Sequence, residues 1–203
     1  MNKQSLVPVF DVGGVFLDWN PRYLYRKLFA DEAEMEHFLS TVCTPEWNLL
    51  QDGGRTWAEA VAELTAQFPE HAELIGYYDT RWEEMIPRIF DGTVEILREL
   101  QARGPVYAIT NFSAEKFRRA KELWPFLAEF DGCIVSGECR LLKPDPAIYR
   151  LLCDRYGLEA RRCLFIDDVA HNVEGARAVG MQAVQFQSPE QLREELARLG
   201  MLD

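Results

Sequence analysis

The sequence predicts an α/β fold, namely a doubly wound parallel five-stranded sheet that carries an inserted all-helical segment. From residue 91 to the C-terminus, apolar runs of strand length alternate with helical patterns. Such alternation implies parallel strands joined by right-handed crossovers. A further apolar run, residues 7–10, stands alone near the N-terminus, and residues 20–87 contain no strand pattern. We therefore expect a core domain made of residues 1–17 and 91–203 and a helical domain made of residues 18–90.

Local signals mark the first strand and the helices that follow it. The apolar run at residues 7–10 ends in Asp11, after which Gly13 and Gly14 permit a sharp turn. Helix-capping patterns then predict four helices. They begin at Asn20-Pro21, with apolar spacing as far as Leu28, at Thr44-Pro45, at the capping box Thr56-x-x-Glu59, and at about Glu70, from which one helix runs to Pro87.

The remainder of the chain alternates regularly between strands and helices. Continuous apolar runs are typical of buried parallel strands, and glycines close the helices between them. We expect strands at residues 106–110, 132–136, 163–167 and 182–186. The helices are expected from Asp91 to Gly104, from near Ser113, at residues 146–156 and 171–179, and after the capping residue Ser188.

Composition excludes several classes of partner. The net charge of −11 argues against nucleic acid and anionic membranes. An anionic substrate stays open, because a bound cation can reverse the local field. The five cysteines are odd in number and have no C-x-x-C spacing, no apolar run approaches the roughly 20 residues of a membrane span, and no signal peptide is evident. We expect a cytoplasmic protein that is a monomer or a weak homodimer.

Reactive side chains follow four of the predicted strands. They are Asp11, the pair Thr110-Asn111, Lys143 and the pair Asp167-Asp168. Taken singly, each also fits an ordinary helix cap, a solvated loop or an acidic helix start. In a parallel sheet, however, all of them converge on the carboxyl edge, where open α/β sheets bind their ligands.

As a set, these residues resemble the four motifs of the haloacid dehalogenase (HAD) superfamily, whose members are mostly phosphatases. The resemblance covers essentially the whole chain. It implies a HAD-like Rossmannoid core, with residues 18–90 at the place of the family's helical C1 cap. The motifs stand here as Phe10-Asp11-Val12-Gly13-Gly14-Val15, Ile109-Thr110-Asn111, Lys143-Pro144-Asp145-Pro146, and Phe165-Ile166-Asp167-Asp168 followed by Asn172.

The resemblance implies a magnesium-dependent phosphomonoester hydrolase acting on a small phosphorylated metabolite, a sugar phosphate among the candidates. Asp11 would be the nucleophile that forms an aspartyl-phosphate. Mg²⁺ would lie between Asp11 and Asp168, with the Gly13 carbonyl as a further ligand and Asp167 acting through water. The substrate phosphoryl group would be held by Lys143 and Thr110, with Asn111 and Gly14 beside it.

One position departs from the phosphatase pattern D-x-D, whose second aspartate is the general acid and base. That position is Gly13 here, as in the family's sugar-1-phosphate phosphatases with a D-x-G start. Proton transfer of this kind is worth about 10²–10⁴-fold. Either the leaving group departs without a proton, or another residue such as Asp18 or His171 supplies one.

Two other functions stay open. The dehalogenases of the superfamily also lack the second aspartate, although they need no metal and lack an acidic pair like Asp167-Asp168. A non-catalytic binding protein could have kept the fold and lost the acid. Candidates for substrate contacts in the cap are Trp47, Gln51, Arg55 and Trp82.

Overall fold

The computed structural model describes residues 6–203, so the first five residues of the predicted core lie outside it. A five-stranded parallel sheet has the strand order β3-β2-β1-β4-β5, which confirms the predicted architecture. The strand carrying Asp11 at its end is the central one. The strands are β1 (Val7–Phe10), β2 (Tyr107–Thr110), β3 (Gly132–Val135), β4 (Cys163–Asp167) and β5 (Gln182–Gln185).

Strand register places the carboxyl ends of β1, β2 and β4 at one edge. Phe10 pairs with Ala108 on one side and with Ile166 on the other. The ladder continues one step further, since the Asp11 amide donates to the Ile166 carbonyl at 2.8 Å. Asp11 therefore leaves its strand beside Asp167, the last residue of β4.

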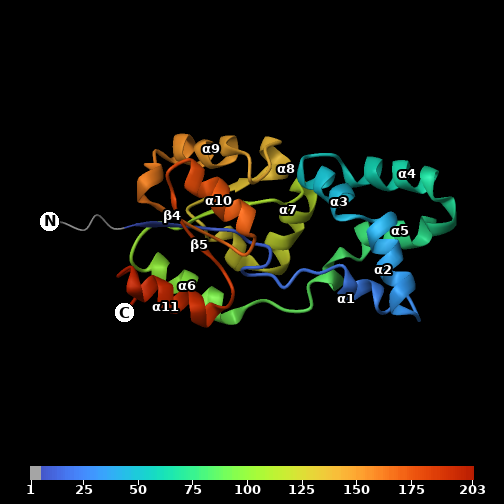
Figure 1. Cartoon of the computed structure of the whole chain (residues 1–203), viewed down its shortest axis with the longest axis horizontal. Coiled ribbons are helices and arrows are strands. Elements are labelled where there is room, and N and C mark those ends of the chain that lie inside the picture. The colour runs from blue at the N-terminus through green and yellow to red at the C-terminus, as the bar shows by residue number, and fades with distance from the viewer. Residues whose placement is uncertain (1–5) are drawn as a thin grey trace.

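Helices cover both faces of the sheet because successive strand side chains point to opposite sides. Phe10 packs into one hydrophobic cluster with residues of α6, α7 and α11, whereas Val9 packs into another with α9 and α10. In Figure 1, α6 and α11 run side by side below the sheet and α9 and α10 lie above it. These helices are α6 (Asp91–Gln101), α7 (Ala114–Leu123), α9 (Pro146–Tyr156), α10 (Ala170–Ala178) and α11 (Pro189–Arg198).

The segment between Asn20 and Pro87, all of which the structure describes, contains helices and no strand. Its longer helices gather at one end of the molecule, beside the layered core (Figure 1). Thr56 and Glu59 form the predicted capping box, and Thr44 caps the next helix upstream by accepting from the Trp47 amide at 3.1 Å. The elements are α1 (Arg22–Tyr25), α2 (Glu32–Thr41), α3 (Pro45–Asp52), α4 (Trp57–Gln67), a 3₁₀ turn (Pro69–His71), α5 (Ala72–Thr80) and a 3₁₀ turn (Trp82–Met85).

Two predicted helices are shorter than expected. The first ends at Tyr25, since the Leu28 amide bonds to the Tyr25 carbonyl three residues back, which is a turn rather than an α-helical bond. The helix predicted from Glu70 to Pro87 is broken at Arg81, which has φ −124° and ψ 20°. Apolar spacing could not reveal either break, because a helix followed by a 3₁₀ turn buries residues at similar intervals.

The sequence patterns did not predict the ten-residue helix α2 or several short elements. The short elements are the four-residue helix α8 (Ser136–Cys139) behind β3 and the 3₁₀ turns Pro125–Ala128 and Ala160–Arg162. Within residues 6–203, no helix combines the length and the apolar character needed to cross a bilayer.

Candidate active site

Asp11 lies just beyond β1 and is only 7% exposed. Its Oδ1 accepts a hydrogen bond from the Val12 amide at 2.6 Å, and its Oδ2 lies 2.8 Å from Lys143 Nζ. Burial raises the pKa of Asp11 to about 8; the charge of Lys143 opposes the rise, and those of Asp167 and Asp168 add to it. The carboxylate is thus held in a fixed orientation at the edge of the sheet.

Lys143 is buried between two carboxylates. Besides Asp11, its Nζ contacts Asp167 Oδ2 at 2.6 Å. Burial lowers the pKa of Lys143, but the charges of Asp11 and Asp167 outweigh that effect, so its pKa is raised overall. Asn111 holds the backbone of Lys143 from the neighbouring loop: its Oδ1 accepts from the Lys143 amide at 2.8 Å, and its Nδ2 donates to the Lys143 carbonyl at 3.1 Å.

The two residues of the acidic pair differ in exposure: the side chain of Asp167 is buried, and that of Asp168 is accessible from the cavity. Asp167 is fully buried, and it accepts from the Val169 amide at 2.8 Å and from Asn172 Nδ2 at 3.1 and 3.0 Å. Asp168 lines the cavity above the sheet edge. Burial, with a further contribution from Asp167, raises the pKa of Asp168.

The donor set suits a small divalent cation. Asp11, Asp167 and Asp168 each offer a carboxylate oxygen, and these oxygens all lie within 4.8 Å of one another. Within the described chain, these three carboxylates and the ammonium of Lys143 leave two uncompensated negative charges, which add to the effect of burial in raising the pKa of Asp11 and of Asp168. Oxygen ligands and a charge deficit of two fit Mg²⁺, whose own charge would lower those pKa values again.

The two glycines after Asp11 have different roles. Gly14 adopts φ +69°, and a Cβ built on it would lie 2.4 Å from Cγ of Asp168. A Cβ on Gly13 would meet nothing within 4 Å, and Gly13 is absent from the residues of positive φ. The backbone turn and the close approach to the acidic pair thus depend on Gly14, whereas Gly13 has room for a side chain.

Thr110, the last residue of β2, is fully buried and does not itself line the cavity, although the next residue, Asn111, does. Its Oγ1 has no hydrogen-bond partner among the described residues. A buried hydroxyl without a partner costs about 1–3 kcal/mol, so this atom is available to a bound group.

A cavity of about 430 Å³ opens over these residues. Asp11, Gly13, Gly14, Asn111, Lys143, Asp168 and Asn172 contribute to its floor from the core, and the side facing the helical segment is rich in aromatic rings. Of the four residues predicted as contacts from the helical segment, only Trp82 lines it. Trp47, Gln51 and Arg55 instead pack within the helical segment, where Gln51 donates to the Trp47 carbonyl and accepts from Arg55. The residues of the helical segment that line the cavity are Trp19, Asn48, Asp52, Trp57, Tyr78, Trp82 and Met85.

Sequence patterns missed Asn48 and Asp52, which lie one helical turn apart on α3. One local signal could have drawn attention to Asp52: it ends a helix just before Gly53-Gly54, as Asp11 follows a strand shortly before a glycine turn. The structure also separates the two proton donors proposed from sequence. His171 lines the cavity, but Asp18 does not, and its Oδ2 is bound by Arg88 Nε at 2.7 Å and by the Tyr23 hydroxyl at 3.0 Å.

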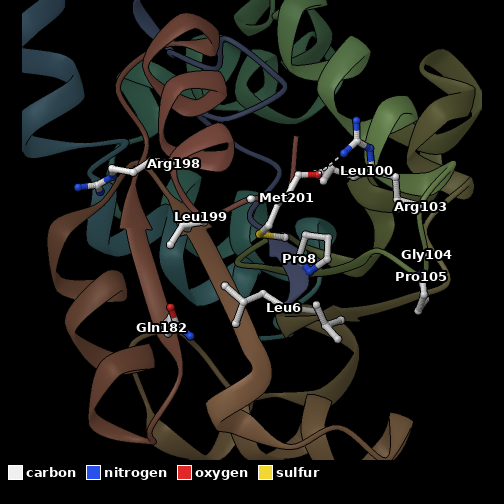
Figure 2. Close-up of a pocket in the computed structure, with 12 residues that line it drawn as sticks. Leu6, Pro8, Leu100, Arg103, Gly104, Pro105, Gln182, Arg198, Leu199 and Met201 are labelled. Atoms are coloured by element: carbon white, nitrogen blue, oxygen red, sulfur yellow. Dashed lines mark hydrogen bonds between the residues drawn. The ribbon is translucent and has the colours of Figure 1, made fainter. Parts of the chain in front are cut away.

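A second cavity, of about 490 Å³, lies at the opposite end of the strands (Figure 2). It is bordered by Pro8, Leu100, Gln182 and Met201, together with Arg103 and Arg198. None of its lining residues within the described chain carries a carboxylate or a nucleophilic side chain. The larger hollow is therefore separate from the edge where the reactive groups gather.

Comparison with known proteins assigns the family. A family model described as haloacid dehalogenase-like hydrolase matches residues 9–180. The chain belongs to this family. The matched range begins in β1, ends behind α10 and includes Asp11, Lys143 and the acidic pair. The protein is accordingly an enzyme, a HAD-like hydrolase, which disfavours the non-catalytic alternative.

Similar proteins within the family have more than one activity. A sesquiterpene phosphatase, astK, of Aspergillus oryzae is 26% identical over 175 residues, which are 85% of each chain. An (S)-2-haloacid dehalogenase of Pseudomonas sp. is 31% identical over 98 residues, covering 48% of this chain and 43% of the dehalogenase. A solved HAD family enzyme from Bacteroides thetaiotaomicron, in complex with magnesium and inorganic phosphate, has a TM-score of 0.70 at 19% identity, covering 91% of this chain and 96% of that one. This likeness supports the HAD fold.

Proposed function

We propose that this HAD-like hydrolase is a magnesium-dependent phosphomonoester hydrolase that acts on a small phosphorylated metabolite through an aspartyl-phosphate on Asp11. The observation that carries the proposal is the acidic triad: Asp11, Asp167 and Asp168 place carboxylate oxygens within 4.8 Å of one another, and among residues 6–203 only Lys143 forms ion pairs with them. The site therefore carries an excess of negative charge that a divalent cation would neutralise. Enzymes of phosphoryl transfer use such a cation to stabilise the charge that develops on the phosphoryl oxygens.

Different residues of the site would bind the metal ion, orient the nucleophile and bind the phosphoryl group. Mg²⁺, when bound by Asp11, Asp168 and the Gly13 carbonyl, would supply charge neutralisation for attack on an anion. Lys143, held in place by Asn111, would orient the Asp11 carboxylate and bind phosphoryl oxygens. The free hydroxyl of Thr110 and backbone amides near Gly14 would donate to the same oxygens.

The cavity supports a leaving group that packs against rings. Trp57, Tyr78 and Trp82 contribute flat apolar faces, whereas Asn48 and Asp52 offer hydrogen-bonding groups. A sugar ring presents both C–H faces and hydroxyls, so a sugar phosphate suits this lining. A phosphorylated apolar alcohol suits the rings as well, and the similar Aspergillus enzyme is named a sesquiterpene phosphatase.

We further propose that residues 18–90 act as a cap domain on the core of residues 1–17 and 91–203. The absence of strands between Asn20 and Pro87 and the contribution of α3, α4 and α5 to the cavity support this division. A cytoplasmic monomer or weak homodimer stays our prediction for compartment and assembly.

Haloacid dehalogenation is the second candidate, since dehalogenases are among the similar proteins. The acidic triad argues against it. A dehalogenase of the family needs no metal, and without a cation Asp167 and Asp168 would repel the charge on Asp11. Displacement of halide would need Asp11 as the nucleophile, but it would give the Asp168 carboxylate in the cavity no chemical role.

A single assay separates the two functions. The purified protein is incubated with phosphorylated metabolites and, separately, with a 2-haloacid, each with Mg²⁺ and after chelation with EDTA. We expect phosphate release that stops on chelation, returns with Mg²⁺ and is lost in Asp11→Asn. Asp18→Asn, the same change outside the cavity, should keep it. Halide release that survives chelation would instead assign a dehalogenase.

A further inference from the structure

Gly13 leaves the core without the usual proton donor, and the structure brings another carboxyl group to the same cavity. Asp52 is the last residue of α3, and it lines the cavity together with Asp11, Lys143 and Asp168. It comes from the cap side, opposite the sheet edge. A leaving group bound between the two sides would thus have the nucleophile below it and Asp52 facing it.

The position of Asp52 is set by the core itself. Its carbonyl accepts a hydrogen bond from the Ser136 hydroxyl at 2.6 Å, and that same hydroxyl accepts from the Phe112 amide at 2.9 Å. Ser136 directly follows β3, and Phe112 lies just beyond β2, so Asp52 is tied to the carboxyl edge of two strands. Asn48 donates to Oδ2 of Asp52 at 3.1 Å and orients the carboxyl group.

The surroundings favour the protonated form. Burial raises the pKa of Asp52 to about 7, against the opposing effects of the Ser113 backbone amide and of Lys143. The C-terminal end of α3 acts in the same direction as burial, because its carbonyl groups disfavour a nearby negative charge. The charged and titratable groups around it are Asp11, Tyr78, Lys116, Lys143, Asp168 and His171 in the cavity, and Arg140 against the turn at Gly54.

Other proton donors are less suitable. Asp18 lies outside the cavity in its pair with Arg88. Lys116 forms an ion pair with Asp79 and lies over the rings of Trp57 and Trp82, so its ammonium group is already engaged by other partners. His171 is exposed in the first turn of α10, and no hydrogen bond from another residue of the described chain orients its ring.

We propose that Asp52 is the general acid and base of this enzyme and takes the place of the acid missing at Gly13; the proposal rests on the phosphatase function proposed above. As Asp11 bonds to phosphorus, the bond from phosphorus to the leaving oxygen breaks, and its electron pair stays on that oxygen. The carboxyl proton of Asp52 passes to the oxygen, so the alcohol departs neutral. Water then attacks phosphorus and gives a proton to the Asp52 carboxylate. The bond from phosphorus to Asp11 breaks, phosphate leaves and both residues return to their starting forms.

The test is a series of phosphate monoesters of decreasing leaving-group quality, from nitrophenyl through phenyl to alkyl phosphates, assayed with Mg²⁺. In the wild type we expect kcat/KM to depend weakly on the leaving group and to fall for alkyl phosphates as the pH rises above about 7. Asp52→Asn should lower kcat/KM by about 10²–10⁴-fold for alkyl phosphates but by much less for nitrophenyl phosphates, and it should lose that pH dependence.

Three further variants sharpen the comparison. Asp18→Asn is the matched control and should leave the series unchanged. Gly13→Asp in the Asp52→Asn background should restore alkyl phosphate hydrolysis in part, because a Cβ at Gly13 meets nothing within 4 Å. His171→Gln tests the exposed histidine. A selective loss on alkyl phosphates in that variant would assign the proton to His171.

Failure of the proposal differs from failure of the underlying function. If nitrophenyl phosphates are not hydrolysed with Mg²⁺, the phosphatase assignment itself is wrong. A steep leaving-group dependence in the wild type, or an equal loss on all esters in Asp52→Asn, would overturn the role of Asp52 and leave the phosphatase intact. The wild-type series needs no variant, so it decides the question even if Asp52→Asn folds poorly.

Discussion

Gly14 lies so close to Asp168 that a Cβ on Gly14 would stand 2.4 Å from the carboxyl carbon of that residue. We therefore predict that Gly14→Ala displaces Asp168 and weakens metal binding together with activity. It should also lower the free energy of unfolding by about 1–2 kcal/mol, because alanine is strained at φ +69°. Calorimetric Mg²⁺ titration and chemical unfolding measure the two effects.

The adjacent glycine provides the control. Gly13→Ala introduces the same methyl group one residue away, where nothing lies within 4 Å. We expect Mg²⁺ affinity and stability close to those of the wild type. Equal damage from both substitutions would mean that the loop as a whole, rather than the contact with Asp168, limits the site.

Thr110 carries a buried hydroxyl without a protein partner, so stability and activity should respond in opposite directions to its removal. Thr110→Val should raise the free energy of unfolding by about 1 kcal/mol, because an unsatisfied buried hydroxyl is replaced by a methyl group. The same variant should lower kcat by about 10²-fold or more if this hydroxyl binds the transferring phosphoryl group.

Thr110→Ser is the matched variant, since it keeps the hydroxyl and loses only a methyl group. Here we expect most of the activity to survive while stability falls by about 1 kcal/mol. Activity that stays high in Thr110→Val would show that the hydroxyl plays no part in turnover.

Mg²⁺ should stabilise the fold by relieving repulsion within the acidic triad. At a concentration about 100 times its Kd, binding to the folded state alone adds about 2.7 kcal/mol to the free energy of unfolding. The expected result is a rise in melting temperature that is absent in Asp168→Asn. In the absence of metal, Asp168→Asn should have a higher melting temperature than the wild type, because the substitution removes one of the carboxylate charges that repel each other in the triad. A similar Mg²⁺ shift in both proteins would place the ion elsewhere.

Ionisation of Asp52 should make the free energy of unfolding depend on pH, and comparison with Asp52→Asn separates this contribution from that of the other titratable groups. The pKa of Asp52 is raised from an ordinary 3.8 to about 7 by burial, so the folded state holds the proton more tightly than the unfolded state. The stabilisation from that proton is present below about pH 4 and is lost as the pH rises toward 7. Asp52→Asn cannot lose a proton. Its advantage over the wild type in the free energy of unfolding should grow from near zero at pH 4 to about 2–4 kcal/mol at pH 8.

This comparison is made without metal, so that ionisation of the triad is common to both proteins. Chemical unfolding at several pH values measures it. A difference that does not change with pH would mean that Asp52 is already ionised in the folded protein, and it would also remove support for its role as a proton donor.

Several features of this protein followed from the sequence alone. Local patterns predicted every strand, because a buried parallel strand must be a continuous apolar run between turns. Capping residues such as Thr56 located helix starts, since an exposed backbone amide needs a nearby acceptor. Because the predicted strands are parallel, the side chains at their carboxyl ends must meet at one edge of the sheet, and this rule alone places Asp11, Lys143 and Asp167 together.

Other features depended on contacts between distant segments. Which glycine adopts positive φ, which of two adjacent aspartates is buried, and where a helix breaks near Arg81 are decided by packing. The cap residues of the cavity show this most clearly. Trp47, Asn48 and Asp52 belong to one helix, yet only Asn48 and Asp52 line the cavity, because these two are four residues apart on one face of α3, whereas the Trp47 side chain is on another face. The spacing of apolar residues along a sequence indicates which face of a helix is buried. Which segment of the protein packs against that face is decided by the tertiary structure.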